Sequence, residues 1–395
     1  MHELPTLTKM TTSFGPTANT ASVRFLGLSR WFSIAVVLAV SFWLSESCGF
    51  SGELKTKNVI LVMTDGLRWQ EVFEGAEEGL LTEAEGGVLH VGKTRTAYWR
   101  DNRDERRRVL MPFFWDVVAK NGQLYGNRLE GSSATVTNGM KFSFPGYNEM
   151  LVGVDDAQIK SNARKPNRNV TVFEWLHHKP GFKDRVAAFS SWSAVPSVFN
   201  RARCGFPVMG GREKLPVEHP NARQELLNNL IFETSDALPN GLYDSFTYHA
   251  AREQILTQEP RLLFVGFLET DAWAHAGRYD HVLHSVHAVD GYVKKLWETV
   301  QSIDHYRDNT TFIITTDHGR GSGRHAWKDH DQTVEGSEDI WMAFLGPDTP
   351  ALGEQTNCKP VFLNQIAATL AKFLGEDYRH DVPQAGEPIQ AVFAD

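Results

Sequence analysis

The sequence predicts an α/β fold in which a mostly parallel central sheet carries helices on both faces. Uncharged runs rich in β-branched residues recur at 59–63, 262–268, 311–316 and 340–345, and each has the length of a buried strand. Segments with helical periodicity separate them, which is typical of parallel strands joined by crossover helices. We expect one domain over residues 55–395, with cap insertions near 74–110 and 154–245.

The remaining elements follow in chain order. A helix is expected over Met111–Lys120, because Asn121-Gly122 provides a stop. The stretch Ser132–Gly153 contains a proline and many polar residues, and is expected to be a loop. The later expectations are helices at Val172–His178, Ala222–Phe232, Tyr243–Leu256, His281–Ile303 and Val361–Leu374, and a further strand at Arg185–Phe189.

The composition limits the classes of function. The chain has 395 residues and a net charge of −8 without a concentrated basic tract, so no nucleic-acid-binding surface is expected. Three cysteines are too few for a disulfide framework. Cys204 and Cys358 could pair in an oxidising compartment, and two unpaired thiols fit the sequence equally well.

Residues 1–47 have the pattern of a signal peptide or an N-terminal anchor. Arg24 and Arg30 precede an apolar run from Trp31 to Leu44, which is shorter than the roughly 20 residues that span a membrane. Small residues at 45 and 47 would allow cleavage before Cys48; the alternatives are an uncleaved anchor or a lipid on Cys48. We therefore expect an exported protein that is periplasmic, extracellular or membrane-anchored.

Metal-binding side chains follow three of the predicted strands. Asp65 follows the first strand, Asp271 and His275 follow the strand at 262–268, and Asp317-His318 follows the strand at 311–316. Carboxyl ends of parallel strands meet at one edge of a sheet, which is where ligands bind in open α/β folds. Three carboxylates brought together there would repel one another, so a cation is their natural partner.

Histidines are concentrated in the same part of the chain. Eight of the 15 lie between His275 and His330. His281, His284 and His287 recur every third residue along the long helix, so we interpret them as its polar face. The others strengthen the prediction of a metal site.

These segments together resemble the alkaline phosphatase superfamily, and most closely its nucleotide pyrophosphatase/phosphodiesterase (type I phosphodiesterase) branch. Thr64-Asp65-Gly66 matches the first metal carboxylate, Ser143-Phe144-Pro145 the nucleophile segment, and Asp317-His318-Gly319 the carboxylate–histidine pair. Asp271 and His275 match the other metal site. Its last ligand is a histidine about sixteen residues before a strand ending in Gly-Pro, which fits His330 better than His325 or His380. The motifs occur in the family's order over residues 57–347.

The resemblance implies an alkaline-phosphatase-like fold and a two-metal enzyme acting on small-molecule phosphate esters, with diesters favoured. One divalent ion would be held by Asp65, Asp317, His318 and Ser143, and the other by Asp271, His275 and His330. Ser143 would be the catalytic nucleophile and form a phospho-serine, and Asn148 would contact the substrate. Mixed carboxylate and imidazole ligands favour Zn over Mn or Fe.

The sequence departs from the family pattern at the nucleophile. Ser-Phe-Pro-Gly-Tyr replaces the usual Thr-Phe-Pro-Asn-His, and Tyr147 stands where sulfatases need an arginine. Alternatives are therefore a phosphomutase, a sulfatase-like hydrolase, or a metal-stabilised binding module without catalysis. Ser132, Ser133 and Thr135 are minor alternatives to Ser143. Arg68, Arg320 and Arg324 flank the site, and surface charge is the default interpretation of each.

Overall fold

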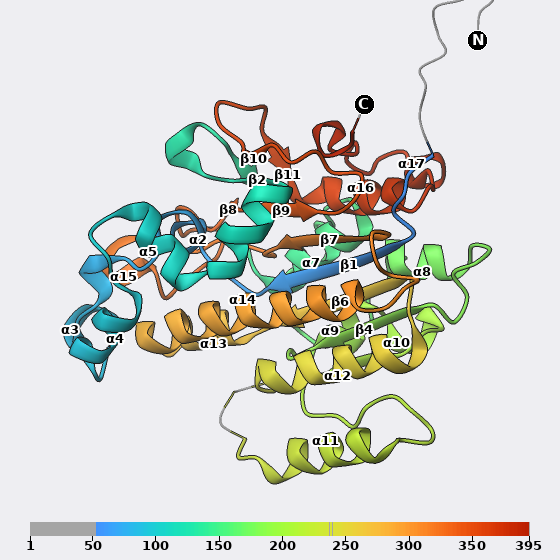
Figure 1. Cartoon of the computed structure of the whole chain (residues 1–395), viewed down its shortest axis with the longest axis horizontal. Helices are drawn as coiled ribbons and strands as arrows, with labels where there is room; N and C mark the ends of the chain where they lie inside the picture. Colours follow the sequence, from blue (N-terminus) through green and yellow to red (C-terminus); the bar gives the residue numbers. More distant parts are fainter. Residues whose placement is uncertain (1–52, 237, 239, 395) are drawn as a thin grey trace, which may run out of the picture. The chain divides into compact units, whose positions relative to one another are not determined.

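The protein has an eight-stranded sheet that is parallel except for one strand (Figure 1). The computed structural model describes residues 53–394 except 237 and 239. The strand order is β10-β2-β9-β7-β1-β6-β4-β5, and β9 runs antiparallel to both of its neighbours. The strands are β1 (Asn58–Thr64), β2 (Gln123–Tyr125), β4 (Val186–Ser190), β5 (Val208–Gly210), β6 (Leu262–Phe267), β7 (Thr310–Thr315), β9 (Met342–Leu345) and β10 (Gly353–Glu354). The predicted α/β class is confirmed.

The centre of the sheet is buried on both faces. Strand β1 pairs in parallel with β6 on one side and β7 on the other, with Thr64 opposite Phe267 and Met63 opposite Thr315. Alternate residues of β1 contribute to two separate hydrophobic clusters: Ile60 and Val62 to one, Val59, Leu61 and Met63 to the other. Since both faces are apolar, helices must cover both.

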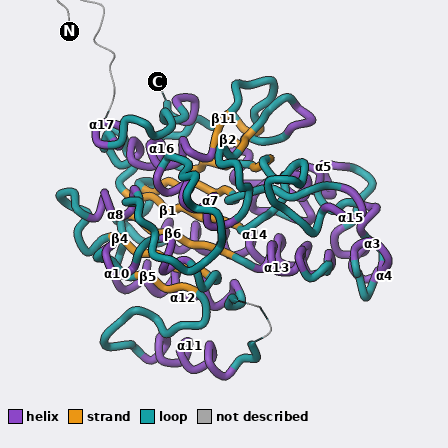
Figure 2. The backbone as a smooth tube through the Cα atoms, turned by 180° about the vertical axis from the view of Figure 1, so that it is seen from behind, coloured by secondary structure: helices purple, strands orange, loops and turns teal. Residues whose placement is uncertain are grey.

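Helices cover both faces of the sheet (Figure 2). The cluster on one face includes residues of α2 (Trp69–Glu74), α5 (Arg103–Leu110), α11 (Ala222–Glu233), α12 (Asp244–Gln258) and α14 (Tyr279–Gln301). The other cluster includes residues of α7 (Ser143–Val152), α8 (Val172–His177), α9 (Val195–Val198), α10 (Arg201–Cys204), α16 (Ile366–Phe373) and α17 (Tyr378–Asp381). Shorter helices are α3 (Glu83–Gly86), α4 (Val91–Tyr98), α13 (Glu269–His275) and α15 (Gly323–Ala326).

The expectation that residues 154–245 form a cap insertion is wrong for the part that belongs to the main sheet. Strands β4 and β5 lie within that segment, and they extend the parallel sheet beyond β6. The expected strand at 340–345 is two strands, because Trp341 separates β9 from β8 (Asp339–Ile340), which joins β3 (Ala134–Thr135) and β11 (Val361–Phe362) in a small second sheet. The expected helix at 361–374 accordingly begins only at Ile366.

Two further segments differ from the sequence interpretation. The helix expected at 111–120 contains a π-helical stretch, η2 (Phe114–Val118), that runs into α6 (Ala119–Asn121). Much of the loop expected at 132–153 is helix α7, whose ten residues are all buried. Pro145 is tolerated there because it lies in the first turn, where backbone N–H groups have no partner within the helix.

The predicted leader at 1–47, with Cys48, lies outside the described residues. Within the described part of the chain, no helix is both long and apolar enough to cross a membrane. Cys204 and Cys358 are both free thiols, so the disulfide alternative is not realised.

Candidate metal centre and nucleophile

The order of the strands brings the three predicted acidic positions together. Asp65 directly follows β1, the central strand of the three, and Asp317 follows β7 by two residues. Asp271 lies in α13, which starts two residues after β6. Since β1 is parallel to both neighbours, all three carboxylates lie at the same edge of the sheet.

The first group consists of Asp65, Asp317 and His318, whose ligand atoms lie within 4.8 Å of one another. All three side chains are buried. Asp317 Oδ1 accepts a hydrogen bond from the Gly66 backbone at 3.1 Å, but its buried Oδ2 has no hydrogen-bond partner. His318 Nδ1 lies 2.9 Å from the carbonyl oxygen of Gly319, so it carries the proton and Nε2 presents a lone pair to the carboxylates.

Neither carboxylate of this group forms an ion pair with a lysine or arginine of the described residues. Burial raises the pKa of Asp65 well above its usual range, and the nearby Asp271 carboxylate raises it further. Burial likewise raises the pKa of Asp317, with Asp65 as the next cause. Two buried carboxylates and an imidazole lone pair converging around an oxygen without a partner fit a divalent cation.

The second group consists of Asp271, His275 and His330 and is more open. His330 Nε2 lies 3.4 Å from Asp271 Oδ1, and His275 Nε2 lies 3.5 Å from the same oxygen. The two Nε2 atoms are 3.0 Å apart, while His330 Nδ1 faces the carbonyl oxygen of Lys141 at 3.2 Å. The His275 side chain is 44% exposed, so this group forms the mouth of the centre.

The imidazoles of the second group are suited to be neutral ligands. Burial lowers the pKa of His275, and burial together with the nearby His318 lowers the pKa of His330 to about 2. His318 itself joins the two groups, since its ligand atom lies within 4.8 Å of those of Asp271 and His330, and its ring stacks on that of His330 at 3.8 Å. The sequence assigned His318 to the first group alone.

The serine predicted as nucleophile faces the first group. Ser143 is the first residue of α7, and its Oγ lies 3.5 Å from both Asp65 Oδ1 and His318 Nε2. One turn later, the Tyr147 hydroxyl lies 3.5 Å from Asp65 Oδ2. Burial raises the pKa of Tyr147 well above its usual range, so its phenol is a neutral donor. The helical period of Phe144, Tyr147 and Met150 is the signal that could have identified α7 and this contact.

Glycine allows α7 to approach the strand end. A Cβ on Gly146 would lie 2.3 Å from the backbone oxygen of Asp317, closer than any real contact. Gly66 is similar: its φ of +56° favours glycine, and a Cβ would lie 2.8 Å from Asp271 Oδ1. Both positions therefore need glycine for close packing around the carboxylates.

We expect Gly146→Ala to lower turnover about 100-fold, because a displacement of α7 by about 1 Å moves Ser143 out of line with the carboxylates. The measurement is ester hydrolysis together with the melting temperature. Gly139→Ala is the matched control, since nothing lies within 4 Å of a Cβ there. Equal activity of the two variants would contradict the close-approach argument.

Arg320 was not assigned to the site by the sequence, yet the structure places it there. Its side chain is 2% exposed and pairs with Asp271, while its Nε donates to the carbonyl oxygen of Trp327 at 3.2 Å. Arg68 is also buried and pairs with Glu71, so the surface interpretation is wrong for both arginines. It is correct for Arg324, whose side chain is 74% exposed.

The structure does not support substrate contact by Asn148. Its side-chain nitrogen donates to the carbonyl oxygen of Val154, and its oxygen accepts from the amides of Asn167 and Asn169. The buried amide therefore braces the loop after α7.

The alternative ligands and nucleophile named in the sequence analysis lie elsewhere. His325 and His380 are exposed on α15 and α17. Ser132 is buried, and its Oγ accepts from the backbone N–H of Gly126.

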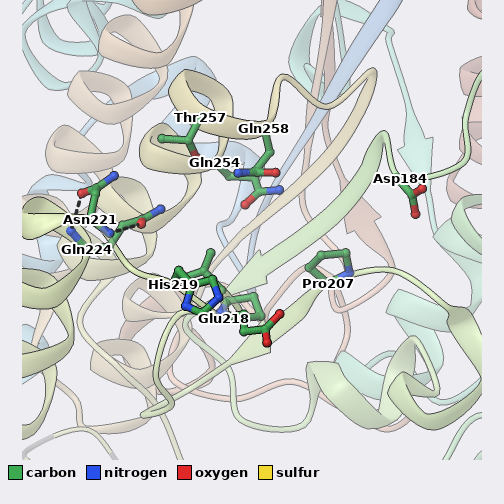
Figure 3. A pocket seen from close by; sticks show the side chains of 11 residues that line it. Asp184, Pro207, Glu218, His219, Asn221, Gln224, Gln254, Thr257 and Gln258 are labelled. Atoms are coloured by element: carbon green, nitrogen blue, oxygen red, sulfur yellow. Dashed lines mark hydrogen bonds between the residues drawn. The ribbon is translucent and has the colours of Figure 1, made fainter.

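Two cavities of the described residues have walls that include none of the proposed metal ligands. One of about 510 Å³ is lined by Gln254, Gln258, Glu218 and His219 (Figure 3). Asp184 and Pro207, which also line it, precede β4 and β5, so it opens at the amino ends of these strands, opposite the metal centre. Another, of about 380 Å³, has Phe144 in its wall, next to Ser143 in the chain.

Residues 208–378 match the family model of the Metalloenzyme superfamily, a range that includes Asp271, His275, Asp317, His318 and His330. The alkaline phosphatase PafA has a similar fold, with a TM-score of 0.55 and 11% identity over 87% of this chain and 99% of that chain. The expected alkaline-phosphatase-like fold is confirmed. The phosphonate monoester hydrolase of Agrobacterium radiobacter shares the fold, with a TM-score of 0.53 and 13% identity over 85% of this chain and 78% of that chain. Such low identities show the fold alone, and the nearest branch stays a prediction.

One curated relative is a 2,3-bisphosphoglycerate-independent phosphoglycerate mutase of Haloquadratum walsbyi. It is 28% identical over 110 residues, which are 28% of this chain and 20% of that protein. The chain thus matches about a fifth of the length of this relative.

Proposed function

We propose that the protein is a metal-dependent hydrolase of phosphate esters in which Ser143 is the nucleophile. The observation that carries the proposal is a serine hydroxyl held 3.5 Å from a buried carboxylate, beside a second carboxylate whose Oδ2 has no partner. A hydroxyl is a poor nucleophile at neutral pH and has to be activated, and coordination to a metal ion is one way to do so.

Two divalent cations, with Zn favoured by the donor set, would make the alkoxide of Ser143 accessible and neutralise negative charge on the ester. Attack by Ser143 Oγ on phosphorus forms the phospho-serine and breaks the bond to the alcohol oxygen, which takes up a proton from solvent. Water then cleaves the phospho-serine and restores the hydroxyl. Tyr147 holds Asp65 in place throughout, because its phenol stays neutral and keeps donating.

The support for a preference for diesters is a cavity whose wall includes Phe144, the residue that follows Ser143 in the chain. The cavity of about 380 Å³ next to Phe144 is large enough for a second ester substituent. Lys160 and Lys165 line it, while Arg168, also in the wall, is paired with Asp156 at 2.7 Å. The two lysines would favour a substituent that carries negative charge.

A phosphomutase is the second candidate, favoured by the relative described above. Such an enzyme would return the phosphate of the serine to another hydroxyl instead of to water. The sulfatase alternative has less support, since Tyr147 points at Asp65 in the place where sulfatases need arginine. A binding module would have little use for a serine held against the carboxylates.

The test is a panel of chromogenic phosphate monoester, phosphate diester and sulfate ester, each with and without chelator. We expect chelator-sensitive turnover of the phosphate esters, with the diester faster. Turnover of sulfate alone would refute the proposal. Conversion of 3-phosphoglycerate to 2-phosphoglycerate without free phosphate would establish the mutase, and inactivity of metal-replete protein on every substrate would favour the binding module.

We further propose export through the leader at 1–47. Its sequence pattern is the support, and a cell-fractionation experiment with N-terminal sequencing tests it. A mature protein that starts near residue 48, outside the cytosol, is the expected result; an intact cytosolic N-terminus would contradict export.

A further inference from the structure

The three carboxylates of the centre differ in their cationic partners. Asp271 is paired with the buried guanidinium of Arg320. Over residues 53–394, apart from 237 and 239, no lysine or arginine forms an ion pair with Asp65 or Asp317, although the charge of Arg320 still acts on Asp65 through space. His318 Nε2 lies 3.3 Å from Asp65 and 3.6 Å from Asp317. The guanidinium is fixed, because its Nε and Nη2 also donate to the carbonyl oxygens of Trp327 and Lys328.

This pairing gives the two groups different net charges. Imidazoles are neutral when they bind a metal, so the first group carries the two negative charges of Asp65 and Asp317. In the second group, Arg320 cancels the single charge of Asp271. A divalent cation entering the first group neutralises it, whereas one entering the second group adds charge beside a guanidinium.

The two groups also differ in how much of their side chains is exposed to solvent. Asp65, Asp317 and His318 are each fully buried, so a cation there is protected from solvent and its electrostatic attraction is strong. In the second group the His275 side chain is 44% exposed, which leaves that position open to exchange.

We propose that the centre binds one divalent cation tightly at Asp65–Asp317–His318 and a second one weakly at Asp271–His275–His330, and that Arg320 sets the difference. The inference rests on the proposed metal centre but not on the ester that is hydrolysed. It gives Arg320 a positioning role: the arginine holds Asp271 in place while the second position is empty, and makes filling of that position depend on the free metal concentration.

The test is a titration of the chelator-treated full chain with Zn²⁺, followed by calorimetry, and metal analysis after dialysis. We expect about one ion per chain to be retained, and a second binding step at least about 100-fold weaker. One adjacent charge changes the proton affinity of a carboxylate about 10- to 1,000-fold, and a divalent cation is subject to the same field. Arg320→Gln keeps hydrogen-bond donors but loses the charge, so it should tighten the second step at least tenfold and leave the first unchanged.

Two variants serve as controls. Arg324→Gln removes an exposed arginine four residues away and should leave both steps as in the wild type. Arg320→Lys retains the charge and should retain the gap between the steps. Two equally tight steps in the wild type, or a second step that Arg320→Gln leaves unchanged or weakens, would overturn the inference.

If Arg320→Gln does not fold, Asp271→Asn provides the decisive titration. It should remove only the weak step; loss of the tight step would overturn the assignment. The titration needs no turnover, so a chain that shows both steps but hydrolyses no ester would refute the proposed function and leave this inference standing.

Discussion

Ser143→Ala is expected to lower turnover about 10⁴- to 10⁶-fold, the range for loss of an enzyme nucleophile. The variant lacks the oxygen that the proposed function assigns to the bond with phosphorus. Its metal content should stay close to that of the wild type, because the carboxylates and imidazoles that surround the oxygen remain. The measurements are steady-state hydrolysis, elemental analysis, and capture of ³²P from labelled substrate by acid quenching.

The control for this variant is Ser133→Ala, which removes a nearby hydroxyl of the same polar segment and should keep full activity. A Ser143→Ala protein that still hydrolyses esters at more than a hundredth of the wild-type rate would refute the assigned nucleophile. Labelled phosphate on the Ser143→Ala chain would lead to the same conclusion.

Asp317→Asn is expected to have opposite effects on the metal-free and the metal-loaded protein. Without metal, the wild type holds Asp65 and Asp317 close together in a buried position, and replacing one carboxylate relieves that repulsion and raises the melting temperature. With Zn²⁺, the wild type gains stability by binding the ion, about 4 kcal/mol at a concentration 1,000 times the Kd, and the variant loses most of that gain. Turnover falls about 1,000-fold or more, since a metal ligand is lost.

Thermal unfolding with and without Zn²⁺ checks this prediction. Asp155→Asn, at an exposed position on the loop after α7, is the control and should match the wild type under both conditions. A metal-free Asp317→Asn protein that melts below the metal-free wild type would show that the carboxylate is stabilising by itself, and that no cation is needed to explain its burial.

Much of the fold and the convergence of the site could be predicted from the sequence, because buried parallel strands have a clear signature. The apolar runs that became β1, β6 and β7 end in the residues that the structure brings together. A strand was predicted at 185–189, where β4 lies, but the whole segment was assigned to an insertion because sequence alone does not show which strands pair.

The positions that were predicted wrongly are those whose structure depends on tertiary contacts. Helix α7 was hidden by its proline and its polar surroundings. The burial of Arg320 depends on the carbonyl groups of Trp327 and Lys328 and on Asp271, three partners that no sequence pattern connects. Asn148 was selected for its closeness to Ser143 in the chain, but its side chain is used by the following loop.

The pairing of β1 with β6 and β7 joins segments about 200 and 250 positions apart, as Val59 lies opposite Leu262 and Thr311. Such long loops must close before the ligands meet, and they make folding slow. A cation therefore finds no binding site in the early stages of folding, when Asp65 and Asp317 are still far apart. A cation bound at the proposed centre would act afterwards, by slowing the unfolding of a chain that has already reached its final topology.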